Sequence, residues 1–168
     1  WLIMKHVSVL LNESIEGLNI KPDGVYGDLT LGRAGHSKEI AKRLTSGKLY
    51  CFDKDEIAIK ECSDFLNENK GKVFAIKDDF RNFKKDLEKL GVSKVDGILA
   101  DLGVSSPQFD DFERGFSYRE EGKLDMRMDR SQALSAFDVI NTYSLQELTR
   151  IFREYGEEKY SFQIATNI

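Results

Sequence analysis

Three short segments of the chain carry residue types that could bind a nucleotide-like ligand. The first is the run D-L-T-L-G-R-A-G-H-S at residues 28–37. Glycines at 32 and 35 would let the backbone approach a ligand closely, and a helix starting near His36 would offer free N–H groups to an anionic moiety. The dinucleotide fingerprint G-x-G-x-x-G is not met, because Thr30 stands where its first glycine is required. A tight turn without a ligand explains this segment almost equally well.

The second segment is a carboxylate that follows the apolar run at residues 49–52. Asp53 lies eighteen residues after Gly35, and a carboxylate at the end of a buried strand can accept hydrogen bonds from both hydroxyls of a ribose. Asp53 could instead cap the helix that follows, but Asp55 is better placed for that role. Together with the glycine-containing loop, Asp53 indicates a nucleoside-binding site.

The third segment is D-L-G-V-S-S-P-Q-F at residues 101–109, directly after another apolar run. It gathers a carboxylate, an amide, two hydroxyls and an aromatic ring within nine residues. A purely structural loop rarely needs so many polar groups. Asp101 and Gln108 are therefore candidate ligand-binding residues.

The elements that must position these segments follow a regular alternation between residues 9 and 108. Strands are expected at 25–28, 49–52, 73–76 and 95–100, and helices at 9–18, 36–46, 55–67 and 83–90. Short apolar strands separated by amphipathic helices are typical of a parallel α/β sheet that is covered on both faces. Ligands bind such sheets at the carboxyl ends of the strands, where all three segments fall.

The sequence becomes polar and rich in turns after Asp110, and helical from about residue 135. Ser144 and Glu147 predict a capping box for a helix that Gly156 ends, and a last helix is expected over 158–168. The arginines between residues 113 and 130 could contact phosphate groups or form a salt-bridged surface loop, and the sequence favours neither interpretation. They are Arg114, Arg119, Arg127 and Arg130.

The composition excludes several classes of protein. The 168 residues are 40% hydrophobic and 32% charged, with a net charge of −4, which argues against a disordered tail and gives no bulk sign of a nucleic-acid partner. The chain has no apolar run long enough for a membrane span, and its start lacks a secretory signal, so we expect a cytoplasmic protein. Cys51 and Cys62 are expected to be buried thiols. Residues 1–3, ahead of Met4, are interpreted as an added segment or an upstream extension.

Four motifs in this sequence resemble the RsmH/MraW family. They are T-L-G-R-A-G-H-S at 30–37, D-L-G-V-S-S-P-Q at 101–108, E-R-G-F-S-Y at 113–118 and L-D-M-R-M-D at 124–129. Shorter segments at 5–13 and 155–158 are similar as well, so the resemblance runs in order through the chain from about residue 4. Two residues depart from the usual pattern: Gly27 stands where an apolar strand residue is common, and Leu29 replaces a small residue.

The resemblance implies a bacterial S-adenosylmethionine-dependent methyltransferase that acts on N4 of a cytidine in the decoding region of small-subunit ribosomal RNA. It implies a Rossmann-like class I methyltransferase sheet, with a cofactor-binding half at residues 4–112 and the start of a helical insertion at residues 113–168. The cofactor-binding residues that it implies are Ala34, Gly35 and His36 at the methionine end, Asp53 at the ribose, Phe80 at the adenine, and Asp101 and Gln108 completing the pocket. Without it, Phe80 would be interpreted as a core aromatic and His36 as structural. It implies no metal site.

Asp101 is the candidate catalytic residue, because it is the nearest carboxylate that could accept a hydrogen bond from the N4 amine or orient it. Two other functions stay open: a truncated, non-catalytic cofactor- or RNA-binding module that is inactive by itself, and an NAD-dependent oxidoreductase, against which the broken fingerprint argues. Members of the family are nearly twice as long. We therefore expect the strand at 95–100 to be an apolar edge, with further strands cut off, unresolved or supplied by another chain. A homodimer stays open. The small ribosomal subunit is the expected partner, and no membrane is.

Overall fold

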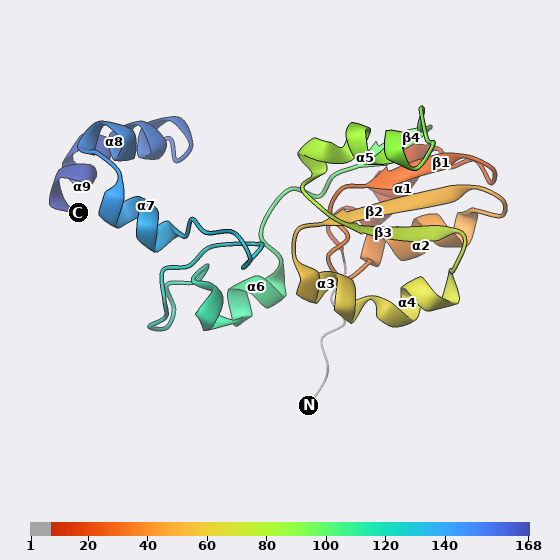
Figure 1. The fold of residues 1–168 in the computed structure, drawn as a ribbon, viewed down its shortest axis with the longest axis horizontal. Helices are drawn as coiled ribbons and strands as arrows, with labels where there is room; N and C mark the ends of the chain where they lie inside the picture. The colour runs from red at the N-terminus through yellow and green to blue at the C-terminus, as the bar shows by residue number, and fades with distance from the viewer. Residues whose placement is uncertain (1–7) are drawn as a thin grey trace. The chain divides into compact units, whose positions relative to one another are not determined.

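The computed structural model describes residues 8–168, which pack as two units that divide after Gly103 (Figure 1). Predictions made for residues 1–7 lie outside the described residues. The strands of the first unit are β1 (Val25–Asp28), β2 (Lys48–Asp53), β3 (Val73–Lys77) and β4 (Gly97–Leu99). They form one parallel sheet in the order β3-β2-β1-β4. This is the order of the first four strands of a doubly wound, Rossmann-like sheet, so the predicted fold class is confirmed.

Both faces of this sheet are apolar and both are covered. The covering helices are α1 (Leu11–Leu18), α2 (Gly35–Arg43), α3 (Glu56–Glu61), α4 (Ser63–Glu68) and α5 (Phe83–Lys89), with a 3-10 turn, η1 (Phe80–Asn82), before α5. Leu49 and Cys51 of β2 pack with Ile40 on the face that carries α1, α2 and α4. Tyr50 and Phe52 point to the opposite face, where they pack with Leu87 of α5. A strand that is buried on both sides has a continuous apolar sequence, which is why β2 is recognisable as a run rather than an alternation.

The predicted elements of the first unit are present; one predicted helix is divided in two, and the other differences lie at the ends of elements. β1 has the predicted bounds. α1 begins two residues late, because Leu10 adopts a left-handed conformation (φ 47°). α2 ends at Arg43, since the backbone N–H groups of Thr45 and Gly47 both donate to the Pro22 carbonyl instead of continuing the helix. β4 is shorter than the strand predicted at 95–100.

The helix predicted over residues 55–67 is two helices, α3 and α4, which meet at Cys62. The backbone of Cys62 leaves the helical region (φ −91°, ψ 7°). Its thiol donates to the Gly32 carbonyl at 3.3 Å, a contact with the glycine-containing loop. Cys51 and Cys62 are both buried free thiols.

Gly27 allows α5 to approach the sheet closely. A Cβ atom at this position would lie 2.6 Å from Cε2 of Phe83, the first residue of α5. The Phe83 ring packs against Phe52, with the ring centroids 5.3 Å apart. The glycine that departs from the family pattern therefore makes room for an aromatic ring.

The second unit, residues 104–168, is helical. Its elements are α6 (Ser106–Asp110), the 3-10 turn η2 (Phe112–Arg114), α7 (Ala136–Thr142), α8 (Leu145–Glu154) and α9 (Ser161–Asn167). The capping box predicted at Ser144 and Glu147 is confirmed, and the last helix begins three residues later than expected. α6 was missed, although Ser105, Pro107 and Gln108 form an S-x-P-Q capping pattern that could have identified its start.

β4 lies at the edge of the sheet, as predicted, and Ile98 at its centre is 48% exposed. None of the helices within residues 8–168 combines the length and apolar character that crossing a bilayer requires. The domain boundary predicted after residue 112 stays a prediction.

Candidate cofactor-binding site

The loop that follows β1 is joined by hydrogen bonds to the carboxyl ends of β2 and β4. The Leu29 N–H donates to the Leu99 carbonyl at 2.9 Å, and the Leu31 N–H donates to the Phe52 carbonyl at 2.9 Å. β2 and β4 lie on opposite sides of β1, so the topological switch point of the sheet lies between β1 and β4. Ligands of open α/β sheets bind at this point.

Asp53 anchors the glycine-containing loop. Its Oδ2 accepts a hydrogen bond from the Gly32 N–H at 2.9 Å, and its Oδ1 accepts one from the Asp55 N–H at 2.8 Å. Burial raises the pKa of the Asp53 carboxyl above its ordinary value. Asp55 caps α3 by accepting from the Ile57 N–H, as the sequence indicated. A carboxylate has about four acceptor positions, so the two backbone bonds leave Asp53 able to accept from hydroxyl groups as well.

Thr30 links the glycine-containing loop to Asp101. The Asp101 N–H donates to Thr30 Oγ1 at 2.8 Å, and the Thr30 N–H donates to Asp28 Oδ1 at 3.0 Å. The Asp101 side chain is exposed. The backbone on which Asp101 stands is thus held to the end of β1, while its carboxylate stays accessible. From the sequence, Thr30 was assigned no part in positioning Asp101.

Asp28 is a buried carboxylate that joins the end of β1 to the first turn of α2. Ser37 Oγ donates to Asp28 Oδ2 at 2.6 Å and lies 3.2 Å from Cys51 Sγ. Burial raises the pKa of the Asp28 carboxyl, although the hydrogen bond from Ser37 acts in the opposite direction. Sequence reasoning missed this residue, although a carboxylate at the end of an apolar strand was the pattern that identified Asp53.

Three predicted site residues, Ala34, Gly35 and His36, lie at the start of α2. Ala34, left-handed at φ 60°, precedes the helix, which begins at Gly35. The first-turn N–H groups of a helix have no acceptor within that helix. Ser8 packs where a side chain on Gly35 would be, so a larger residue there would displace the Ser8 hydroxyl. His36 is buried, and its Nε2–H donates to the Val9 carbonyl at 3.1 Å.

Phe80 lies in η1, directly after the loop that follows β3. Phe80 is 36% exposed. Lys54, the residue after Asp53, places its Nζ 5.9 Å from the centroid of the Phe80 ring. Phe80 therefore stands beside the loop that follows β2, at the same edge as Asp53.

Gln108 belongs to the second unit and is buried there. Its Oε1 accepts a hydrogen bond from the Ser105 N–H at 3.0 Å, which completes the capping box of α6. Hydrogen bonds connect the predicted site residues Asp53 and Asp101 with the glycine-containing loop in the first unit. Phe80 lies on the adjoining loop. The prediction that Gln108 completes the same pocket stays a prediction.

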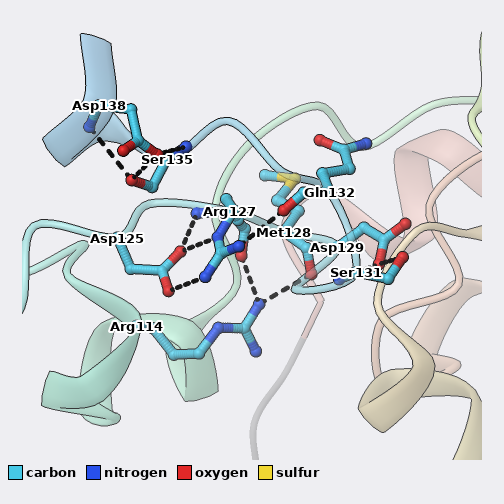
Figure 2. Close-up of polar contacts among 9 residues, drawn as sticks. All are labelled: Arg114, Asp125, Arg127, Met128, Asp129, Ser131, Gln132, Ser135 and Asp138. Carbon is cyan, nitrogen blue, oxygen red and sulfur yellow. Dashed lines mark hydrogen bonds and ion pairs between the residues drawn. The ribbon is translucent and has the colours of Figure 1, made fainter. Parts of the chain in front are cut away.

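Two of the four candidate phosphate-binding arginines are used inside the second unit (Figure 2). Arg114 is only 3% exposed, and its Nη2 donates to the carbonyls of Arg127 and Met128 at 3.2 and 3.0 Å. The Arg127 guanidinium forms a bidentate pair with Asp125, at 2.7 and 2.8 Å, and donates to the Gln132 carbonyl. Arg114 and Arg127 thus order the segment 125–132, whereas Arg119 and Arg130 lie exposed on the surface.

A family profile and several curated relatives all match this chain over most of its length. The sequence profile described as the MraW methylase family matches residues 3–168. "Ribosomal RNA small subunit methyltransferase H" of Mycoplasmopsis synoviae is 55% identical over 163 residues, which are 97% of this chain and 54% of that protein. The proteins of the same name from Exiguobacterium sibiricum and Clostridioides difficile are 54% and 55% identical, over 99% and 95% of this chain and 53% and 52% of their own lengths. The chain spans about half the length of these curated relatives.

Among solved structures, a putative rRNA-methylase from Clostridium thermocellum aligns at 22% identity with a TM-score of 0.42, covering 48% of this chain and 46% of that one. This score is too low to establish a shared fold. The fold assignment therefore rests on the strand order of the sheet.

Proposed function

The chain belongs to the MraW methylase family, and from that premise we propose that it is the cofactor-binding half of an S-adenosylmethionine-dependent methyltransferase. The proposed substrate is N4 of a cytidine in the decoding region of small-subunit ribosomal RNA, in the bacterial cytoplasm. The names of its relatives support ribosomal RNA of the small subunit as the substrate class. The observation that carries the proposal is the hydrogen-bonded connection of Asp53, the glycine-containing loop and Asp101 across the edge of the sheet.

The residues at this edge fit adenosylmethionine. Asp53 keeps acceptor capacity for two ribose hydroxyls beyond its two backbone bonds. The Phe80 ring is partly exposed and can stack on adenine. At Gly32 (φ 50°), an added Cβ would meet only the Thr30 carbonyl, at 3.9 Å, so the loop leaves room for a ligand. The first turn of α2, at Gly35, offers N–H groups to the methionine carboxylate.

Bound adenosylmethionine would supply an electrophilic methyl group. Cytosine N4 is a poor nucleophile, because its lone pair is delocalised into the ring. The protein must therefore orient the amine and accept a hydrogen bond from it as positive charge develops. We assign that acceptor role to Asp101, whose carboxylate is exposed and whose backbone N–H is held by Thr30. The base must be unstacked from the RNA before a side chain can reach N4.

Calorimetric titration with S-adenosylhomocysteine and with NAD tests the cofactor assignment. We expect the chain to bind S-adenosylhomocysteine and not NAD. Binding of NAD without S-adenosylhomocysteine would favour the oxidoreductase alternative and overturn the proposal.

Methyl transfer from labelled adenosylmethionine to unmodified small ribosomal subunits tests the reaction. We expect Asp101→Asn to reduce turnover by about 100-fold or more, since the loss of one preorganised hydrogen-bonding group aimed at transition-state charge typically costs about 10²–10³. An Asp101→Asn variant that keeps both cofactor affinity and turnover would remove Asp101 from the reaction. Cofactor binding without transfer by the unaltered chain would favour the non-catalytic module.

The molar mass of the chain in solution, from light scattering, tests the proposed homodimer.

A further inference from the structure

Lys54 and Asp79 form an ion pair between the two loops that carry Asp53 and Phe80. Lys54 Nζ lies 2.6 Å from Asp79 Oδ2, and the two side chains are only 27% and 11% exposed. Lys54 directly follows Asp53 in the sequence, and Asp79 directly precedes Phe80. The pair therefore connects the backbone next to the proposed ribose acceptor with the backbone next to the proposed adenine-stacking ring.

Asp79 also shapes the turn that presents Phe80. It is the N-cap residue of η1, and its Oδ1 accepts a hydrogen bond from the Arg81 N–H at 2.9 Å. The Arg81 guanidinium and then the Lys54 ammonium hold the pKa of the Asp79 carboxyl well below its usual range, so this side chain stays ionised at neutral pH. One carboxylate thus fixes the start of η1 and the position of Lys54.

Lys54 in turn contacts the face of Phe80. Its Nζ lies 5.9 Å from the ring centroid, within the range of a cation–π interaction. The Lys54–Asp79 pair differs from an exposed surface ion pair such as Lys84–Glu88. In that pair Lys84 Nζ and Glu88 Oε1 are 3.9 Å apart, and the two side chains are 88% and 56% exposed. Exposed pairs of that kind contribute little, whereas a partly buried pair at short distance restricts both of its partners.

We infer that Lys54 and Asp79 are positioning residues that set the orientation of the Phe80 ring relative to the Asp53 carboxylate, and thereby determine affinity for the adenosine part of the cofactor. The inference rests on the proposed cofactor site. Neither residue needs to touch the ligand. The pair holds the two loops in one arrangement before binding, so the ligand does not have to order them at the cost of affinity.

Calorimetry with adenosine and with S-adenosylhomocysteine, on the full chain, tests this role. Lys54→Met and Asp79→Asn should each lower the affinity for both ligands by the same factor, about three- to tenfold. The factor is the same because the changed residues act on the adenosine group, which both ligands contain. Lys54→Arg, which keeps the charge, should retain most of the affinity. Lys84→Met removes an exposed lysine of α5 and serves as the control, with affinity unchanged.

The double variant distinguishes positioning from general damage to the site. If Lys54 and Asp79 act as one unit, the Lys54→Met/Asp79→Asn double variant should bind no more weakly than the weaker single variant. Additive losses, or a loss confined to S-adenosylhomocysteine, would overturn the inference. Should Asp79→Asn fail to fold, because it weakens the cap of η1, Lys54→Met and Lys54→Arg decide the question.

Failure of the inference and failure of the proposed function give different results. If the unaltered chain binds neither ligand, the proposed function is wrong and the inference is wrong with it. If the unaltered chain binds both ligands and Lys54→Met binds them equally well, only the inference is wrong.

Discussion

Asp53 shows how one carboxylate can serve the fold and a ligand together. Its two oxygens hold the Gly32 and Asp55 N–H groups, and its burial raises its pKa. A buried charge is stabilised by each additional hydrogen bond that it accepts. Hydroxyl groups of a ribose would therefore be bound more strongly by the ionised form of Asp53 than by the protonated form.

Cofactor affinity should accordingly depend on pH through Asp53. Because burial raises the pKa of this acid, the ionised form is lost as pH falls through a value above that of an ordinary aspartate. The affinity for S-adenosylhomocysteine should be full above the raised pKa and should decline below it, as calorimetry in a series of buffers can measure. Asp53→Asn should bind weakly at every pH and lose this dependence. A decline that begins only where ordinary aspartates titrate would contradict the assignment.

Among single residues, the sequence predicted those whose residue type is unusual for their position in the chain. Asp53 and Asp101 follow apolar runs, where a carboxylate is conspicuous. The role of Thr30 depends on a hydrogen bond to Asp101, 71 residues further along the chain, which no local pattern specifies. Phe80 was identified only by the family resemblance, because an aromatic residue at the start of a turn is ordinarily part of a core.

At the scale of elements, the distance between α5 and the sheet depends on the absence of a side chain at Gly27. The close approach of Phe83 to β1 leaves no space for a Cβ atom. Phe83 and Phe52 then form part of the cluster that covers the second face of the sheet. The loop that follows β1 carries the candidate site, so the packing of this strand bears on the position of the site residues.

Gly27→Ala should therefore destabilise the chain by about 1–3 kcal/mol, the usual cost of overpacking a core. Urea denaturation followed by circular dichroism would measure the change in the free energy of unfolding. Gly17→Ala is a matched control in α1, where an added Cβ meets nothing within 4 Å. Alanine favours a helix over glycine, so that control should gain about 0.5–1 kcal/mol. Equal effects of the two substitutions would contradict the role of Phe83.

The bounds of elements were predicted less well than their order, for reasons that lie outside each element. α2 ends where the Pro22 carbonyl accepts from Thr45 and Gly47. The break between α3 and α4 falls at Cys62, whose thiol bonds to the Gly32 carbonyl. The apolar spacing that predicted one helix continues through this break, and so could not show it.

At the scale of the whole molecule, the pKa values of buried carboxyls are shifted in opposite directions in the two units. In the first unit, burial raises the pKa of the carboxyls of Asp28 and Asp53 near the candidate site. In the second, hydrogen bonds from Arg127 lower the pKa of the Asp125 carboxyl to about 2. The change in sequence character after residue 110 indicated a second part of the chain. The bidentate pair between Asp125 and Arg127 was not predictable, because the five acidic and five basic residues at 113–130 allow many pairings.

Asp125 should make the stability of the chain sensitive to acid. A carboxyl whose pKa is lowered on folding contributes stability above its unfolded pKa, near 4, and that contribution is lost as pH falls toward the folded value of about 2. Asp125→Asn should lower the thermal midpoint at neutral pH, and its difference from the unaltered chain should shrink as the pH is lowered. Glu121→Gln, at an exposed position of the same unit, should leave the profile unchanged. A difference that stays constant with pH would contradict this account.

The burial of both cysteines has a practical consequence for measurements in solution. Burial raises the pKa of both thiols, to about 11 for Cys62, so both stay protonated and react slowly with maleimide dyes. We therefore expect dyes to label introduced, exposed cysteines in preference to Cys51 and Cys62. New cysteines at exposed positions such as Lys70 in the first unit and Gln146 in the second would accept a donor–acceptor pair of fluorophores. Energy transfer between them would report how far apart the two units are, and whether that distance changes when a cofactor or RNA is added.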